Sequence, residues 1–292
     1  GLGDSIVVVG SGSLWNCHIH TDDVGAAVEA ALDVGRPRRI RVTDLLDQVE
    51  EERWVREAGA ASPEDEETAA VHPPAVTTVV AVANGEGIRR IFRSLGVARI
   101  VAGGQSMNPS TAEVLAAVES APADQVLVLP NNSNIVPVAE RVVGLSPKQV
   151  RVLPTASIAE GFAALMEYDP QAGVEDNRRL MADAASRVVT GEVVRAVRAS
   201  GSPAGPVAAG DWLGLSAAGI EVVAPTPAEA ACHLLARLCD EDHELVTLIE
   251  GEGAHPADTR RITEWLAEHR PRASAEVHHG GQPLYPYLLS IE

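Results

Sequence analysis

The sequence is poor in aromatic and sulfur-containing residues. Phenylalanine, tyrosine and tryptophan together make up 3% of its 292 residues, and there are three cysteines and three methionines. The hydrophobic core must therefore be built from valine, leucine, isoleucine and alanine. An odd number of cysteines excludes a fully paired disulfide framework and is typical of a reducing cytoplasm. Cys232 and Cys239 have the spacing of two core positions on one helix face, which does not favour a reactive pair.

Positive charge is also scarce. Lysine and arginine number 23 against 41 acidic residues, so the net charge is −18, and Lys148 is the one lysine. This balance excludes the basic face expected of a nucleic-acid-binding protein and does not favour an anionic membrane surface. No apolar run reaches the roughly 18 residues of a transmembrane helix, and the first ten residues lack the basic start of a signal peptide. The sequence therefore predicts a soluble cytoplasmic protein.

Strand and helix patterns alternate between residues 76 and 170. A continuous apolar strand at 77–83 is followed by a helix and then by three further strand–helix pairs, with capping residues such as Ser110 and Ser157 at helix starts. This alternation predicts a parallel sheet with right-handed crossovers. The last third has strands of antiparallel character and helices after Thr226 and Pro256, so a mixed sheet is expected there.

The first 75 residues have a different character. Two short strands, at 4–10 and 14–21, precede a helix at 24–34 that Thr21-Asp22-Asp23 can cap. A further strand is expected at 38–42 and a helix at 44–58. An acidic, proline-containing stretch then reads as a linker. The predicted fold class is α/β, with the following division: a small α+β piece at 1–58, a linker at 59–75, a parallel α/β lobe at 76–170 and a mixed-sheet α+β lobe at 171–292.

The histidine pair His18-Ile19-His20 is a candidate metal site. Residues i and i+2 of a strand face the same side, so the two imidazoles can converge on one cation. Zinc needs four ligands, or three and a water, and Cys17 points to the opposite face of a regular strand. The alternative is that both histidines are ordinary half-buried strand residues.

The loops after the predicted parallel strands form a second candidate site. Ligands bind beyond the carboxyl ends of such strands, and small or amide residues there can present backbone N–H groups to an anion. The same residue types also form ordinary caps and turns, and both explanations stay open. None of these loops contains lysine or arginine, and no phosphate-binding glycine motif is present, so nucleotide binding is not favoured. The candidate pocket residues are Asn84, Gly103, Gly104, Gln105, Asn108, Asn131, Asn132, Thr155 and Ser157.

Several segments, taken as a set, resemble the C-terminal part of the YloV-like family of fatty-acid kinase A subunits, which begin with a dihydroxyacetone-kinase L-type ATP domain. The resemblance extends over nearly the whole chain and is weakest in the acidic stretch at 50–74. The matching segments are GDSIVVV (3–9), HIHTDD (18–23), GGQSMNPST (103–111), LPNNSN (129–134), TGEV (190–193), GDWLG (210–214) and HGGQPLYPY (279–287).

The resemblance implies the end of a zinc-binding middle domain followed by a DegV-like C-terminal domain. It implies that His18 and His20 bind zinc together with a cysteine from an earlier strand, so that this chain holds an incomplete site. ATP and magnesium are implied only for the kinase domain. The family phosphorylates a fatty acid that a separate DegV-like subunit carries. The middle domain is implied to support a homodimer.

Two functions are therefore considered. The leading hypothesis is a non-catalytic portion of a fatty-acid kinase that docks the carrier and acts as a scaffold. The alternative is a module that binds a lipid or small anion at the strand-end loops, with a carboxylate held by Thr155, Ser157 and the amides of Gly103 and Gly104. A true dihydroxyacetone kinase is disfavoured, because that enzyme holds its substrate through a histidine and the four loops contain none.

Overall fold

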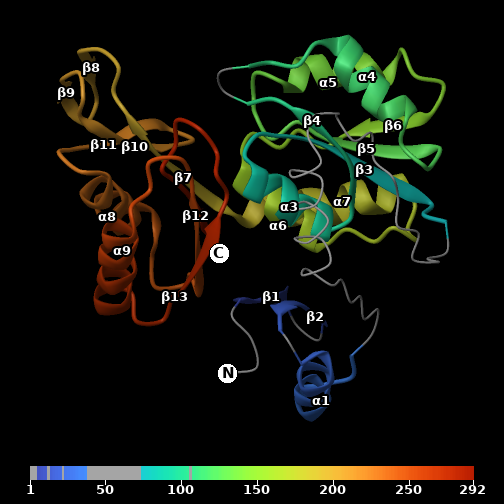
Figure 1. The fold of residues 1–292 in the computed structure, drawn as a ribbon, viewed down its shortest axis with the longest axis horizontal. Helices are drawn as coiled ribbons and strands as arrows, with labels where there is room; N and C mark the ends of the chain where they lie inside the picture. The colour runs from blue at the N-terminus through green and yellow to red at the C-terminus, as the bar shows by residue number, and fades with distance from the viewer. Residues whose placement is uncertain (1–4, 12–13, 22, 38–73, 105–106) are drawn as a thin grey trace, which may run out of the picture. The chain divides into compact units, whose positions relative to one another are not determined.

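The computed structural model describes residues 5–11, 14–21, 23–37, 74–104 and 107–292 (Figure 1). Contacts divide the chain into two units, residues 1–74 and 75–292. In the first unit, β1 (Ser5–Ser11) and β2 (Leu14–His20) form an antiparallel pair, followed by α1 (Val24–Val34). The Asp23 carboxylate accepts the backbone N–H of Ala26 at 2.9 Å and caps this helix as expected. The strand predicted at 38–42 and the helix predicted at 44–58 lie outside the described residues.

The second unit begins with a parallel sheet of four strands in the order β4-β3-β5-β6. All seven residues of β3 are buried, as its continuous apolar sequence predicts for a central parallel strand. Helices cover both faces of the sheet (Figure 1). The elements are β3 (Thr77–Ala83), α3 (Glu86–Ser94), β4 (Val97–Ala102), α4 (Thr111–Glu119), β5 (Gln125–Leu129), α5 (Val136–Val143), β6 (Gln149–Val152), α6 (Ile158–Met166) and α7 (Val174–Arg187).

Two hydrophobic clusters hold this parallel lobe together. One contains side chains of α3, α6 and α7 on one face of the sheet, and the other contains side chains of α4 and α5 on the opposite face. Val79 and Ala81 of β3 belong to the first cluster, whereas Val80 and Val82 belong to the second, as the alternation of strand side chains requires. Helix α7 lies on the parallel sheet with α6, although the sequence places it after the expected split at 170.

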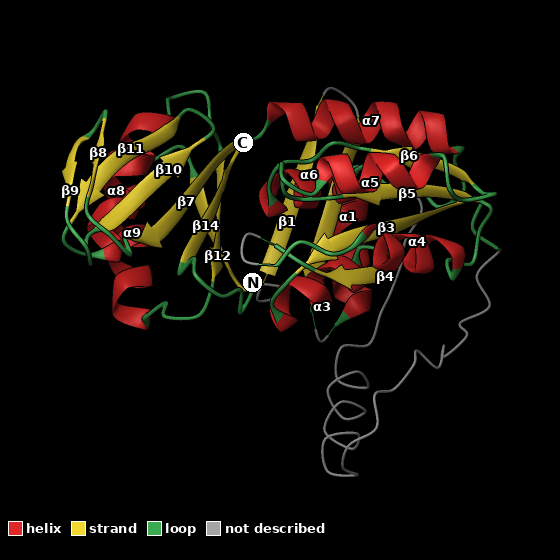
Figure 2. Cartoon of the chain, turned by 90° about the horizontal axis from the view of Figure 1, so that it is seen from above, coloured by secondary structure: helices red, strands yellow, loops and turns green. Residues whose placement is uncertain are grey.

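The rest of the unit is built on a six-stranded mixed sheet in the order β11-β10-β7-β14-β12-β13, where only β12 and β13 are parallel neighbours. Figure 2 shows this sheet and the parallel sheet side by side, each with its own helices. The hairpin β8-β9 was not expected, because its two short strands are rich in glycine and serine and lack an apolar pattern. The elements are β7 (Val189–Arg195), β8 (Ser200–Ser202), β9 (Gly205–Val207), β10 (Trp212–Ser216), β11 (Gly219–Ala224), α8 (Pro227–Leu238), β12 (Leu245–Glu250), α9 (Pro256–His269), β13 (Ser274–His279) and β14 (Tyr287–Ile291).

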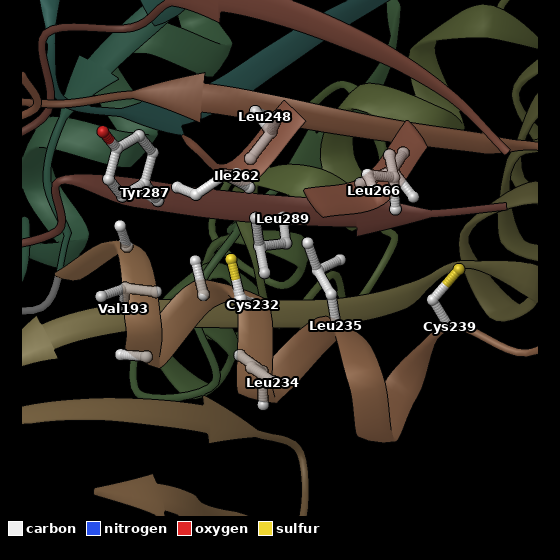
Figure 3. Close-up of a cluster of buried hydrophobic side chains, with 14 of the residues drawn as sticks. Val193, Cys232, Leu234, Leu235, Cys239, Leu248, Ile262, Leu266, Tyr287 and Leu289 are labelled. Atoms are coloured by element: carbon white, nitrogen blue, oxygen red, sulfur yellow. The ribbon is translucent and has the colours of Figure 1, made fainter. Parts of the chain in front are cut away.

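Helices α8 and α9 pack on one face of the mixed sheet and form its core (Figure 3). Cys232 and Cys239 are buried there as free cysteines, which confirms their predicted place in the core. Burial raises the pKa of the Cys232 thiol to about 11, so this residue is protonated near neutral pH and is a poor nucleophile.

The two lobes meet where the turn after β13 packs on the first turn of α3. The backbone N–H of Ile88 donates to the carbonyl oxygen of Gly280 at 3.1 Å. Gly87 lies so close to this turn that a Cβ atom there would overlap the carbonyl oxygen of His279. The same turn continues into Gln282, whose amide nitrogen donates to the carbonyl oxygens of Ile249 and Tyr285. The small size of Gly87 on α3 therefore allows the close approach of this turn, which continues into the segment 282–285.

Candidate functional site

A cavity of about 60 Å³ lies between the two lobes, at the carboxyl ends of the parallel strands. The parallel lobe supplies one wall through the ends of β3, β4 and β5 and the start of α6. The mixed lobe supplies the other through β7, β14 and the segment 282–285. The lining residues are Val82, Asn84, Gly103, Gly104, Pro130, Asn131, Asn132, Ala156, Ile158, Glu192, Gln282, Pro283, Leu284, Tyr285 and Leu288.

The structure gathers some of the candidate pocket residues and separates others. The lining includes Asn84, Gly103, Gly104, Asn131 and Asn132. Gln105 lies outside the described residues. The remaining three, Asn108, Thr155 and Ser157, are not part of the lining.

Asn131 and Thr155 are bonded to each other. Asn131 has a positive φ of 53° and is buried. Its backbone N–H donates to Thr155 Oγ1 at 3.0 Å, and that hydroxyl donates to Asn131 Oδ1 at 2.8 Å. The Asn131 amide nitrogen donates to the carbonyl oxygen of Val82 at 3.0 Å, which ties the loop after β5 to the end of β3. The Thr155 hydroxyl, expected to hold a carboxylate, is thus committed to this internal network.

Backbone N–H groups at the start of α6 are bound by the side chains of Ser157 and Glu160. Ser157 Oγ accepts the backbone N–H of Glu160 at 3.1 Å. A Glu160 carboxylate oxygen accepts the backbone N–H of Ala156 at 2.7 Å, and burial raises the pKa of this carboxyl. An acidic side chain of the protein therefore binds one of the N–H groups that an anionic ligand would need at this helix terminus.

In the other three strand-end loops, side chains also form hydrogen bonds with backbone N–H groups of the same loop. Ser110 and Glu113 form the predicted capping box at the start of α4. At the start of α5, the Asn132 side chain accepts the backbone N–H of Asn134 at 2.9 Å. Before α3, the Asn84 side chain accepts the N–H of Gly85. In the described part of each loop, at least one backbone N–H that could have faced an anion is thus bound by a side chain of the same loop.

Glu192 is the charged residue of the lining that the sequence did not indicate. It lies on β7 and pairs with Leu288 of β14, so both side chains face the cavity from the mixed sheet. Among the described residues its carboxylate makes no hydrogen bond or ion pair. Burial raises its pKa. Glu192 belongs to the TGEV segment (190–193) of the family resemblance, but that segment alone does not place it at the cavity, because its position depends on the pairing of two strands distant in sequence.

We expect Glu192→Gln to stabilise the protein at neutral pH. A carboxyl with a raised pKa in the folded state binds its proton more tightly there than in the unfolded chain. Folding stability therefore falls as the pH rises through the interval between the two pKa values. The glutamine removes this loss, which amounts to about 1.4 kcal/mol for each unit by which the pKa is raised. Thermal melts from about pH 4 to pH 8 should show the variant gaining over wild type as the pH rises. A parallel pair of curves would contradict the burial of this carboxyl.

The two candidate zinc ligands lie on β2. In the β1–β2 register, His18 pairs with Val7 and His20 pairs with Ser5. Among the residues that the structure describes, no group of three histidine, cysteine, aspartate or glutamate side chains is placed to hold a metal. Zinc binding stays a prediction.

Sequence relatives match the chain from end to end. The FakA-like family model for the C-terminal domain of fatty acid kinase A subunits matches residues 78–292, and that for the corresponding middle domain matches residues 1–52. Protein YloV of Bacillus subtilis is 33% identical over 297 residues, which cover 100% of this chain and 52% of that protein. An uncharacterized protein of Staphylococcus haemolyticus is 32% identical over 291 residues, with the same coverage. The chain thus spans about half the length of the curated relatives it matches.

Solved structures agree with the predicted fold class. A DegV family protein from Corynebacterium glutamicum has a TM-score of 0.55 at 16% identity and covers 74% of this chain and 97% of its own. The dihydroxyacetone kinase of C. freundii, solved with AMP-PNP and Mg²⁺, has a TM-score of 0.53 at 18% identity, covering 75% of this chain and 48% of its own. These likenesses confirm a DegV-like α/β fold with one parallel and one mixed sheet. In the described residues, no helix is long and apolar enough to cross a membrane.

Proposed function

The chain belongs to the FakA-like family of fatty acid kinases, and from this premise we propose that it docks and positions the carrier of a fatty-acid kinase without itself catalysing phosphate transfer. The observation that carries the proposal is the match of residues 1–52 and 78–292 to the middle and C-terminal domains of that family. The partner we propose is a separate DegV-like protein that holds the fatty acid.

The size of the cavity supports docking over storage of a fatty acid. Sites that bury a drug-sized ligand enclose about 300 Å³ or more. The cavity between the lobes is about 60 Å³, which is too small for an acyl chain. The Thr155 hydroxyl, which would bind a carboxylate headgroup, donates to Asn131 within the protein, and Ser157 Oγ accepts the backbone N–H of Glu160 as a helix cap. The alternative of a lipid- or anion-binding module is thus less favoured by this geometry.

Exposed apolar side chains near the cavity support a protein partner. Leu284 lines the cavity, is 53% exposed and has a positive φ of 72°. Met107 is 51% exposed and is hydrogen-bonded through its backbone to Gly104 of the lining. A leucine in a left-handed conformation costs about 1 kcal/mol or more, and such strain is concentrated at functional sites. Leu284 therefore combines unfavourable backbone geometry with an apolar surface that a partner can cover.

We expect Leu284→Gly to stabilise the chain slightly and to weaken carrier binding about tenfold. Glycine relieves the positive φ at a gain of about 1 kcal/mol, while loss of the side chain removes apolar contact with the partner. Isothermal titration of the fatty-acid-loaded carrier into wild type and variant measures the binding, and urea denaturation measures the stability. Leu145, 58% exposed and outside the cavity lining, provides the control Leu145→Gly, which should bind as wild type does.

Three outcomes would contradict the docking proposal. They are absence of carrier binding to the wild-type chain, turnover of ATP by the chain alone, and an acyl chain retained by the purified protein in native mass spectrometry. The first removes the partner, the second gives the chain a catalytic role, and the third favours lipid binding.

The family supports two finer proposals for residues 1–52. His18 and His20, two residues apart on β2, would supply two of the four ligands of a structural zinc ion. This region would also support a homodimer. No residue of the chain is assigned to ATP or magnesium.

A further inference from the structure

The cavity between the lobes has one charged group in its lining, the Glu192 carboxylate. No arginine or lysine is among the lining residues, and the carboxylate has no hydrogen-bond or ion-pair partner within the described chain. A half-buried carboxylate without a cation is unfavourable, because burial removes water without replacing it by an opposite charge. The cavity is therefore complementary to a positive group.

The helix terminus that faces the cavity does not offset this charge. Ala156 and Ile158 of the lining stand at the N-terminus of α6, whose partial positive charge would favour an anion. That terminus is already engaged by the Ser157 hydroxyl and the Glu160 carboxylate. The positive end of this helix is therefore partly compensated by an acidic side chain of the protein and supplies no counter-ion for Glu192.

The other lining groups suit a cationic side chain. Tyr285 is also part of the lining, and aromatic residues together with carboxylates are the groups that bind ammonium and guanidinium ions. A volume of about 60 Å³ matches the space of about two water molecules, which is enough for the end of a lysine or arginine side chain. The exposed Leu284 beside the cavity offers apolar contact to the methylene stem of such a side chain.

We propose that this cavity receives a lysine or arginine side chain of the docking carrier, with Glu192 as its counter-ion. The proposal rests on the proposed function. It also accords with the net charge of −18, which steers a basic partner surface towards this chain. The cavity then acts as the specific contact within a broader electrostatic attraction.

The test compares two variants, each of which replaces one glutamate by the neutral glutamine. Glu192→Gln removes the charge in the cavity, and Glu268→Gln removes one from an exposed position on α9, the helix layer on the opposite face of the mixed sheet. By isothermal titration at fixed salt, we expect Glu192→Gln to weaken carrier binding at least about 30-fold, as for loss of one partner of a buried charge pair. Glu268→Gln should stay within about twofold, because an exposed rim charge contributes little.

A second measurement tests the cavity without the carrier. In NMR titrations, n-butylammonium and n-propylguanidinium should shift the backbone amides of Gly104 and Tyr285 in wild type and not in Glu192→Gln. Sodium hexanoate should leave them unchanged. Shifts with hexanoate alone would overturn the proposal in favour of an anion site.

The two proposals fail in different ways. If the carrier binds wild type and Glu192→Gln equally, the cation cavity is overturned while docking stands. If the carrier does not bind wild type at all, docking fails and the assignment of the cavity to the carrier fails with it.

Discussion

Replacing Gly87 with alanine should destabilise the unit of residues 75–292 by more than about 4 kcal/mol, a loss outside the usual range for a single substitution. The added Cβ would overlap the carbonyl oxygen of His279 and lie 2.7 Å from its carbonyl carbon and 2.9 Å from the Cα of Gly280. All three are backbone atoms, so no side-chain rotation relieves the clash. The turn must move away from α3, and the hydrogen bond from Ile88 to Gly280 must break.

Gly144 provides the control for this prediction. It follows α5 with a φ of −88°, and a Cβ there would have no atom within 4 Å. Gly144→Ala should therefore leave stability unchanged or raise it slightly, by reducing the freedom of the unfolded chain. Urea denaturation followed by far-ultraviolet circular dichroism compares the two variants. Equal midpoints for Gly87→Ala and Gly144→Ala would show that the turn does not pack on α3 as described.

Much of the fold follows from local sequence. The strand Thr77–Ala83 contains the apolar run Val79–Ala83 after two threonines, and a short run of this kind is typical of a strand buried on both faces in a parallel sheet. Ser110 with Glu113, and Thr226 with the N–H of Glu229, place helix starts because the chemistry of a cap lies within four residues. Such elements are predictable since the residues that determine them are neighbours in the chain.

The candidate site could be predicted only in part, because the residues that determine it are distant from one another in the chain. Asn131 and Thr155 were expected at the strand ends and are found there, yet their hydrogen-bonding groups satisfy each other. Nothing in either loop alone shows that pairing. Glu192 faces the cavity because β7 pairs with β14, and the positive φ of Leu284 occurs at a leucine, a residue type that does not favour it. These positions depend on tertiary contacts that no local pattern encodes.

Asn131 was predicted from the sequence, but its hydrogen bonds depend on tertiary contacts. Its substitution should cause the second large loss of folding stability. Asn131→Ala should lower stability by about 3 kcal/mol. It leaves the carbonyl oxygen of Val82 and the hydroxyl of Thr155 without the carboxamide that they contact, at about 1–3 kcal/mol for each unsatisfied group. Alanine also tolerates the positive φ of 53° less well than asparagine does.

Asn131→Gly separates these two causes. Glycine adopts positive φ freely but makes neither side-chain hydrogen bond, so it should recover about 1 kcal/mol relative to alanine and remain well below wild type. Urea denaturation of the three proteins gives both differences. Equal stability of the alanine and glycine variants would show that the backbone at 131 is unstrained. A wild-type stability for the alanine variant would show that the hydrogen bonds to Val82 and Thr155 contribute nothing.

Because the Asn131 carboxamide ties the loop after β5 to β3 and to Thr155, both variants should also lose part of the cavity wall. Weaker carrier binding by both, in proportion to their loss of stability, would mean that the wall and the fold depend on the same hydrogen bonds.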